Sequence, residues 1–270
     1  VPVPGTVTVS RHLQAVQHQT GGIIDKILIK EGDHVTMGQV LVRMNDVQIK
    51  AQAEITRTQL MAAQATEARL LAERDGKNEI SYPTELLSIQ NDSRVTNNII
   101  IQNQLFLSRR LALQHEIAAL DENMAGLKVQ LRGLEASKSS KLQQSRLLEE
   151  QLVNMRDLAT DGFVPRNRVL ELERTFTQLS GEISADIGNI GRTQRQISEL
   201  EQRRIHRQQE YQKEVRQLLS DTKKEAESLQ NRLHGQDFEL ANVEVRAPVD
   251  GTIVGMNVFT EGGVIGSGFK

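Results

Sequence analysis

GIIDKILIKEGD at residues 22–33 is repeated as GTIVGMNVFTEGG at residues 251–263, and this repeat decides the fold. When one extra residue is allowed before Glu261, the apolar residues of the two copies coincide, and Gly38 falls on Gly268. The coinciding residues are Ile24, Ile27 and Ile29 in the first copy and Ile253, Met256 and Val258 in the second. An internal repeat of this kind is one structural unit used twice.

Each copy alternates apolar and polar residues before a turn that contains glycine, which predicts short strands with one buried face. Neither copy could bury that face alone, so we expect the two halves to close on each other as a small β-sandwich. The intervening chain of about 190 residues must leave one half and return to the other. It is therefore predicted to be a hairpin.

The intervening sequence is typical of helices. Residues 46–73 and 94–155 contain no proline and little of the residue clustering that marks loops. Apolar residues recur at steps of three, four or seven, which predicts a coiled-coil seam with charged residues on a solvated face. The outgoing seam is Ile99, Phe106, Leu113, Ile117, Leu120, Met124, Leu127, Leu131 and Leu134. The return seam is Leu172, Phe176, Leu179, Ile183, Ile187, Ile190, Gln194, Ile197, Tyr211, Val215, Leu218 and Thr222.

Helix lengths predict how many helices lie side by side. At 1.5 Å per residue, the return helix 165–242 spans about 117 Å and the outgoing helix 94–156 about 95 Å. A first helix over 46–77, about 48 Å long, cannot be stacked end to end beneath the outgoing one. We expect it to run alongside the base as a third helix, with residues 78–93 doubling back around Pro83.

DLATDGFVP at residues 157–165 interrupts the helices and predicts the hairpin tip. Gly162 suits a helix C-terminus, and Pro165 suits the first turn of the next helix. Phe163 and Val164 are apolar residues at an exposed turn. They either plug the space between the helix ends or form a contact surface for a partner.

Composition favours an elongated α+β protein over a globular one. Only 3% of residues are aromatic and 38% hydrophobic, so most burial is expected along a seam. The net charge of −2 gives no reason to expect nucleic acid as a partner. No apolar run is long enough to span a membrane, and no signal peptide is present. The chain opens abruptly at Val1 and stops inside a half-motif at Lys270, so it is interpreted as a cut fragment.

Catalytic chemistry is not predicted. The chain has no Cys, and none of its six His residues are spaced to put two metal ligands on one helix face. The glycine pairs at Gly21 and Gly262 lack a phosphate-loop lysine, and no apolar pocket is expected to raise the pKa of a carboxylate. We therefore expect neither an enzyme nor a cofactor or metal.

The two half-motifs resemble biotinyl and lipoyl carrier domains. In that family the modified lysine lies at a tight hairpin between the two halves, where this chain has its helical insertion. Neither Met-Lys-Met nor Asp-Lys-Ala is present. The resemblance therefore implies a split lipoyl-like β-sandwich that carries no swinging-arm cofactor.

A lipoyl-like domain split by a helical hairpin resembles the HlyD family of periplasmic adaptors, or membrane fusion proteins, over nearly the whole chain. The resemblance rests on QTGGIIDKI at 19–27, EGDHVTMGQVL at 31–41, GFVP at 162–165 and VRAPVDGT at 245–252. The tip and the extra first helix are most similar to adaptors of type I secretion, in the PrtE-like protease-exporter branch.

This resemblance implies four segments. Residues 1–12 would be part of a β-barrel-type domain, 13–45 the first lipoyl half, 46–242 the helical hairpin, and 243–270 the second lipoyl half, truncated.

It also implies a function in the periplasm of a Gram-negative bacterium, with an inner-membrane anchor absent from this fragment. Such adaptors form rings, commonly hexamers, between an inner-membrane ABC transporter and a TolC-like outer-membrane channel, and secreted protein cargo passes through them. Two alternatives are an adaptor of a multidrug efflux pump and a purely structural coiled-coil protein.

In this family an Arg, a Leu four residues later and a Ser seven residues after that dock the channel. The same spacing falls on Asn154, Leu158 and Pro165, so only the Leu matches. Leu158 could equally be the last seam residue. The predicted docking tip comprises Asn154, Arg156, Leu158, Gly162, Phe163, Val164, Pro165 and Arg166.

The second site implied by the resemblance is the rim where lipoyl domains of neighbouring copies touch. Glu31, Asp33 and Glu261 are predicted to lie in its turns, where they could meet basic residues of a neighbour. They could equally be solvated turn residues, because exposed ion pairs contribute only about 0 to 1 kcal/mol.

Overall fold

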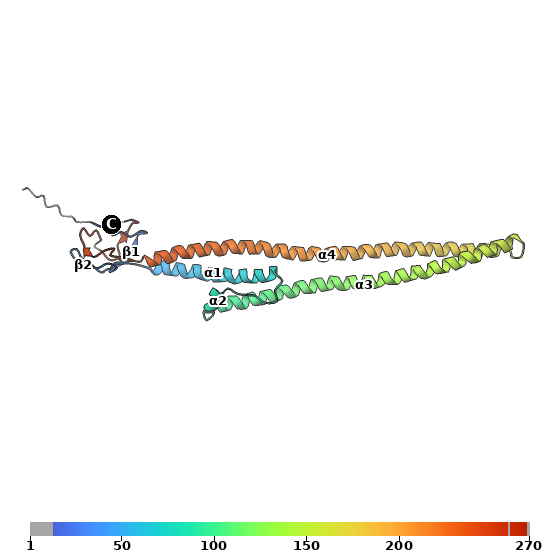
Figure 1. The fold of residues 1–270 in the computed structure, drawn as a ribbon, viewed down its shortest axis with the longest axis horizontal. Coiled ribbons are helices and arrows are strands. Elements are labelled where there is room, and N and C mark those ends of the chain that lie inside the picture. Colours follow the sequence, from blue (N-terminus) through green and yellow to red (C-terminus); the bar gives the residue numbers. More distant parts are fainter. Residues whose placement is uncertain (1–12, 259, 269–270) are drawn as a thin grey trace, which may run out of the picture. The chain divides into compact units, whose positions relative to one another are not determined.

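The computed structural model describes residues 13–258 and 260–268, so the predicted β-barrel-type segment 1–12 lies outside the described residues. The chain forms three strands, four helices and three further strands in that order (Figure 1). The helices are α1 (Val47–Arg74), α2 (Thr84–Ser88), α3 (Ser93–Thr160) and α4 (Arg166–Ala241). The strands are β1 (Gly22–Ile27), β2 (His34–Val35), β3 (Val40–Met44), β4 (Glu244–Arg246), β5 (Gly251–Thr252) and β6 (Val264–Ile265). The predicted α+β fold with a long helical hairpin is confirmed.

The described residues form two compact units. The first unit contains the strands, α2, most of α1, the start of α3 up to Gln102 and the end of α4 from Leu219. The second unit contains residues 73–78 and 103–218, including the turn between α3 and α4.

Every strand pair but one joins the N-terminal half-motif to the C-terminal one. The larger sheet has the order β4-β3-β1-β6, and β2 pairs with β5 in a smaller sheet. All pairings are antiparallel, and only β1 with β3 pairs strands of the same half. The two halves therefore complete one another, as the repeat predicts.

Two apolar clusters form the core of these sheets. Ile29, Val35 and Leu41 of the first half pack with Ala247 of the second. Ile24 and Met44 pack with Val243, which lies two residues after the end of α4. Burial of apolar surface from both halves is the main term that holds them together.

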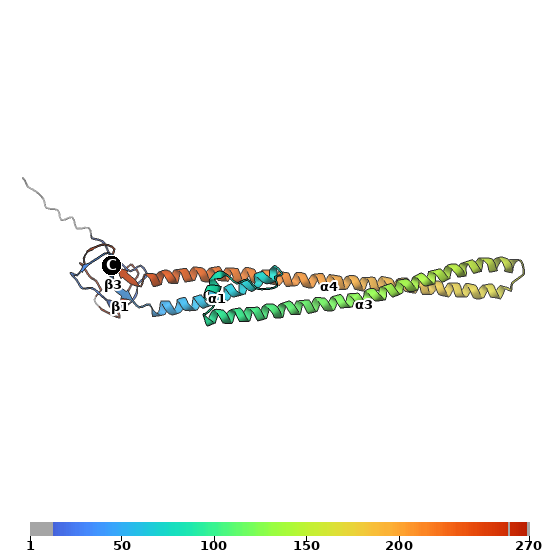
Figure 2. The same cartoon turned by 60° about the horizontal axis from the view of Figure 1, so that its bottom comes forward.

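In the first unit, α1 packs on two sides, as Figures 1 and 2 show for its contact with the end of α4. Ala53, Leu60 and Ala63 contact Ala226, Leu229 and Leu233 of α4. On another face, Met61 and Ala65 contact Leu86 of α2 and Val95 of α3. The predicted third helix at the base is thus confirmed, and its many alanines allow close approach to neighbours on both sides.

The connection between α1 and α3 contains a helix that the sequence did not predict. Pro83 cannot donate a backbone hydrogen bond, but its carbonyl accepts from Leu86 and Leu87 at 3.1 Å and so starts α2. Leu86 is only 1% exposed and anchors this short helix on α1 and α3.

The predicted positions of the α3 seam are buried or half-buried, and so are most of those of the α4 seam, but three positions of α4 are exposed. Ile187 is 51% exposed, whereas Asp186 beside it is 8% exposed. In the same way, Thr193 is buried and Gln194 is exposed. In the first unit, Leu219 is buried where the sequence favoured Leu218. The three predictions are wrong because consecutive four-residue steps rotate the seam by about 40° each, which an apolar pattern alone does not locate.

Candidate functional site

The hairpin tip is held in one conformation by backbone hydrogen bonds. The N–H of Phe163 donates to the carbonyl of Leu158 at 2.9 Å, and the N–H of Gly162 donates to that of Ala159 at 3.2 Å. These two bonds form a Schellman motif that ends α3. Gly162 has a φ of +80°, a conformation that costs any residue with a Cβ about 1–2 kcal/mol. After the turn, the carbonyl of Pro165 accepts from the N–H of Arg168 at 3.1 Å as α4 begins.

The tip presents apolar side chains to solvent. Phe163 is 77% exposed, which contradicts a plug between the helix ends. Leu158 is 43% exposed, while the seam passes through Leu152, Met155 and Ala159 instead. Leu158 is therefore not the last buried seam residue, and it shares an exposed tip with Phe163.

The charged residues near the tip have different environments. The Nη2 and Nε atoms of Arg156 donate to Oε1 of Glu173 at 2.7 and 3.1 Å, which ties α3 to α4 below the turn. Arg166 is exposed, and no ion pair to it is found among the residues that the structure describes. Asn154 is exposed and Val164 half-buried. Of the two arginines predicted to contact a partner, Arg166 is therefore the less constrained.

The three acidic residues predicted at the lipoyl rim all bind backbone groups within the chain. The carboxylate of Glu31 accepts from the N–H groups of Gly255 and Met256, each at 2.7 Å. Asp33 accepts from the N–H of Lys30 at 2.8 Å and closes its own turn. Glu261 lies 3.5 Å from the N–H of Ile27. Glu31 thus joins the two half-motifs. Glu31 and Glu261 are equivalent residues of the two copies of the repeat, and this equivalence could have indicated the role.

A model of the family described as "AprE, long alpha-helical hairpin" matches residues 49–238, more than half of the chain. The chain belongs to the AprE family. The match covers α2, α3 and nearly all of α1 and α4, and therefore includes the tip.

Individual relatives of this AprE-family chain agree with that assignment. It is 38% identical to the alkaline protease secretion protein AprE of Pseudomonas aeruginosa over 268 residues, which are 99% of this chain and 62% of that protein. It is 41% identical to the proteases secretion protein PrtE of Dickeya chrysanthemi, over 99% of this chain and 60% of that protein. The chain thus spans about three fifths of the length of these curated relatives.

Among solved structures, this chain is similar to the soluble domain of LipC, a membrane fusion protein of a type I secretion system. The TM-score is 0.88 at 43% identity, over 94% of this chain and 96% of that one. The predicted resemblance to PrtE-like adaptors is confirmed by these relatives.

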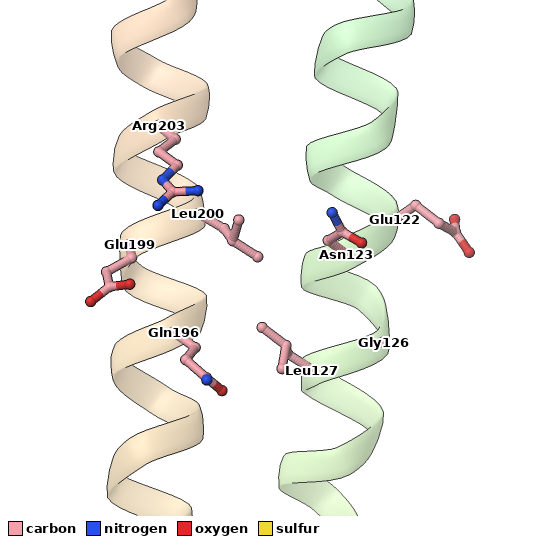
Figure 3. Close-up of a pocket in the computed structure, with 8 residues that line it drawn as sticks. All are labelled: Glu122, Asn123, Gly126, Leu127, Gln196, Glu199, Leu200 and Arg203. Atoms are coloured by element: carbon pink, nitrogen blue, oxygen red, sulfur yellow. The ribbon is translucent and has the colours of Figure 1, made fainter.

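A shallow groove in the middle of the AprE-family hairpin is the clearest alternative site. Its 460 Å³ hollow lies between α3 and α4 (Figure 3), where Leu127 and Leu200 point towards each other. The carboxylates of Glu122 and Glu199 point away from the hollow. Nothing in this arrangement converges on a common point, so the groove is a gap in the coiled-coil packing.

Two buried polar clusters in the second unit of this AprE-family chain were missed by the sequence pattern. The side chain of Glu73 is only 1% exposed and pairs with Arg109 at 3.2 Å. Arg109 also pairs with Glu214 at 3.2 Å and lies 5.4 Å from the ring centre of Tyr211. Glu73 therefore does not belong to the solvated face that the charge pattern predicted. This cluster links the last turn of α1 to α3 and α4.

The second buried cluster lies nearer the tip. Asp186 occupies a seam position, pairs with Lys141 at 2.9 Å and accepts a hydrogen bond from Ser137 at 3.0 Å. The hydrogen bond from Lys141 is the main cause that lowers the pKa of Asp186 below its usual value. A charged seam residue of this kind favours one register over others, because a slipped register leaves it unpaired.

Within the part of the chain that the structure describes, no group of three or more His, Asp or Glu side chains could hold a metal ion. None of the described helices is both long and apolar enough to cross a membrane.

Proposed function

We propose that this chain is the periplasmic part of an adaptor in a type I protein secretion system. It would bridge an inner-membrane ABC transporter and a TolC-like outer-membrane channel and help to form the export conduit for secreted proteins. The proposal rests on membership of the AprE family and on the names of its relatives, which are called secretion or membrane fusion proteins. An efflux-pump adaptor is less favoured, because neither AprE nor PrtE is named for efflux.

The observation that carries a docking role is the exposed tip. Phe163 and Leu158 present apolar side chains at a turn whose backbone is fixed by two hydrogen bonds. A rigid apolar projection loses little conformational entropy when it binds a protein groove. The proposed docking set is the tip of Asn154, Arg156, Leu158, Gly162, Phe163, Val164, Pro165 and Arg166, with Phe163, Leu158 and Arg166 as its main contacts.

Further parts of the proposal concern the assembly. The two lipoyl halves would be residues 13–45 and 243–270. In the assembled complex, the lipoyl domains of neighbouring copies would touch in a ring, which would be a hexamer. The anchor would be a single helix in the inner membrane. Glu31, Asp33 and Glu261 remain candidates for ring contacts. Asp33 and Glu261 would use the carboxylate oxygen that binds no backbone group, and Glu31, whose two oxygens each accept one backbone N–H, would use its remaining lone pairs.

The chain would act without catalysis and without a cofactor of its own. Energy would come from ATP hydrolysis on the transporter. Glu31 accepts hydrogen bonds from backbone groups, and Glu73 and Asp186 form ion pairs between helices, which are structural roles.

Photo-crosslinking in the full-length protein, expressed with its transporter and candidate channel, tests the docking role. A photoreactive residue replaces Phe163 or Leu158, and the matched control replaces Arg203, which is exposed in the middle of α4. We expect adducts to the channel from the tip positions alone. Adducts only between copies of the adaptor, or equal channel adducts from Arg203, would overturn the proposal.

A further inference from the structure

The side of α3 that faces away from α4 carries exposed apolar residues. Leu127 points towards Leu200 of α4 (Figure 3), so it marks the side of α3 that packs in the hairpin. Ala118 and Ala136 each lie nine residues from Leu127, which is two and a half turns at about 3.6 residues per turn. Both alanines therefore lie on the opposite side of the helix, and both are exposed.

Almost every position along this side of α3 is apolar. At about 100° per residue, eight positions between 107 and 147 fall within about 20° of the direction of Ala118. These positions, which we call the outer stripe, are Leu107, Leu111, Ala118, Ala125, Val129, Ala136, Gln143 and Leu147. Steps of four, seven and eleven residues relate them, and such steps keep a stripe nearly straight along an α-helix.

The outer stripe is exposed and carries no charge. The exposed fraction is 57% for Leu107, 43% for Leu111, 59% for Val129 and 60% for Leu147, and the other four residues are exposed as well. None of the eight is charged, although charged residues make up 25% of the chain. All eight belong to the second unit. A solvated helix face normally carries charges, so this face is suited to packing against a partner.

The size of the outer stripe is sufficient for a specific contact. From Leu107 to Leu147 it is about 60 Å long, and an α-helix is about 10 Å wide, so the stripe covers about 600 Å². Two such stripes packed together would bury about 1,200 Å² in total, which is the lower end of the range for specific protein interfaces. One further helix with the same stripe is therefore a large enough partner.

The outer stripe is matched to a second copy of itself in the antiparallel direction. When position 127 of the two α3 helices is set at the same height, every stripe position lies beside a stripe position of the second copy. The pairs are Leu107 with Leu147, Leu111 with Gln143, Ala118 with Ala136, and Ala125 with Val129. The small residues lie towards the centre, where they allow the two helices to approach closely, and large apolar residues lie at both ends.

Charged residues beside the outer stripe favour the antiparallel direction over the parallel one. Asp121 and Arg132 flank the stripe on one side, and Glu122 flanks it on the other. In a parallel pair, Glu122 would face Asp121 of the second copy, and these like charges repel. In the antiparallel pair, Arg132 lies beside Asp121 of the second copy, and Glu122 lies beside Gly133. Asp121 pairs with Arg204 of its own chain at 2.9 Å, but its side chain is still 47% exposed.

We propose that the outer stripe is an interface between two copies of this chain, whose α3 helices pack antiparallel about position 127. The association is reversible, because the buried area is at the lower end of the specific range and three of the eight residues are alanine. A ring that presents every tip to one channel is parallel, so this pair is a separate association. It does not depend on the proposed adaptor role.

Disulfide mapping tests the direction and register, because the chain has no Cys of its own. The test variant carries Ala118→Cys and Ala136→Cys, which lie about 27 Å apart along α3 and cannot bond within one copy. In the antiparallel pair, each Cys lies beside the other Cys of the second copy, so we expect covalent dimers under mild oxidation. The single variants Ala118→Cys and Ala136→Cys should form none.

A register control uses the same side of the helix. The variant Ala118→Cys with Gln143→Cys shifts one of the two positions by about 10 Å along α3, and its covalent dimers should form at least about tenfold more slowly. Equal rates for the test variant and this control would overturn the register. Fast dimers from either single variant would overturn the antiparallel direction in favour of a parallel pair.

Sedimentation equilibrium measures the association without Cys. The native chain should dimerise as its concentration rises, and Val129→Glu should raise the dissociation constant at least about tenfold, because it places two carboxylates near the centre of the interface. Gln202→Glu adds the same charge at an exposed position of α4 and should leave the dissociation constant unchanged. A native chain that stays monomeric at every concentration would overturn a second copy as the occupant and leave the stripe to a different protein. Equal effects of the two Glu variants would overturn the outer stripe as the interface.

Discussion

Glu31 and Met256 lie 225 residues apart in sequence, yet the carboxylate of Glu31 accepts the backbone N–H of Met256 at 2.7 Å. The second oxygen of Glu31 accepts from Gly255 at the same distance. One carboxylate therefore binds the turn of the opposite half-motif with both oxygens, and the whole helical hairpin lies between these two residues along the chain.

Replacing Glu31 with Gln should loosen the joint between the halves. The amide keeps one acceptor oxygen and loses the charge that strengthens both hydrogen bonds, so we expect the joint to weaken by about 1–2 kcal/mol. Hydrogen exchange at Gly255 and Met256 would measure this as faster exchange. Glu261→Gln is the matched control, because its contact with Ile27 is 3.5 Å long, and its effect should be smaller. Equal effects of the two variants would contradict a special role for Glu31.

Gly162→Ala should destabilise the tip by about 1 kcal/mol, because φ at this position is +80°. No atom lies within 4 Å of an added Cβ, so the cost is purely conformational. Gly188→Ala is the control, since that glycine lies inside α4 with similar open space. It should stabilise the helix by up to about 1 kcal/mol. Chemical denaturation followed by circular dichroism would measure the change in the free energy of unfolding of each variant, and the two changes should have opposite signs. Two changes of the same sign would contradict the capping argument.

Arg109→Met should be severely destabilising. The substitution leaves the carboxylate of Glu73, 1% exposed, buried without its main cation, at a cost of about 3–5 kcal/mol. The double variant Arg109→Met with Glu73→Leu should recover most of this loss, because both charges are then gone. Urea denaturation of Arg109→Met, Glu73→Leu and the double variant would measure the coupling free energy between the two side chains. Additive losses would show that Arg109 and Glu73 act independently.

Asp186 should make the hairpin sensitive to acid. The hydrogen bond from Lys141 lowers its pKa in the folded chain, so the folded state favours the ionised form. The resulting stabilisation is present above the unfolded pKa of about 3.9 and is lost as pH falls through the lower folded value. Melting temperatures between pH 7 and pH 2 should therefore converge for the native chain and Asp186→Asn. A constant difference over this range would contradict the assignment.

The two tyrosines should resist ionisation. Burial raises the pKa of Tyr82 to about 12, and burial followed by the nearby charge of Glu73 raises that of Tyr211. Because the folded pKa of each tyrosine is raised, the stabilisation is present below the ordinary value of about 10 and is lost as pH rises through the folded pKa, which for Tyr82 is about 12. Absorbance titration should show little tyrosinate at pH 10 in the folded chain. Tyr82→Phe isolates Tyr211, and half-ionisation near pH 10 in either folded protein would contradict this result.

The candidate site was only partly predictable. Spacing and turn chemistry identified the tip, because Gly162 and Pro165 are local signals. Local pattern did not reveal that Phe163 is exposed and that Arg156 is held by Glu173, since both depend on how α3 and α4 face each other. The preference for Ile187 over Asp186 failed because consecutive four-residue steps rotate the seam. Asp186 tolerates the buried position because Lys141 and Ser137 of the other helix bind its carboxylate.

The sequence by itself determined the three long helices, the split β-sandwich and the position of the tip, but not the short helix α2. These follow from the periods of apolar residues and from glycine and proline, which are properties of short segments. Only the tertiary structure decided which carboxylates are buried and what they bind, including Glu31 on Met256 and Glu73 on Arg109. The physical reason is that solvent exclusion and hydrogen-bond partners come from segments distant in sequence, and no local pattern records their approach.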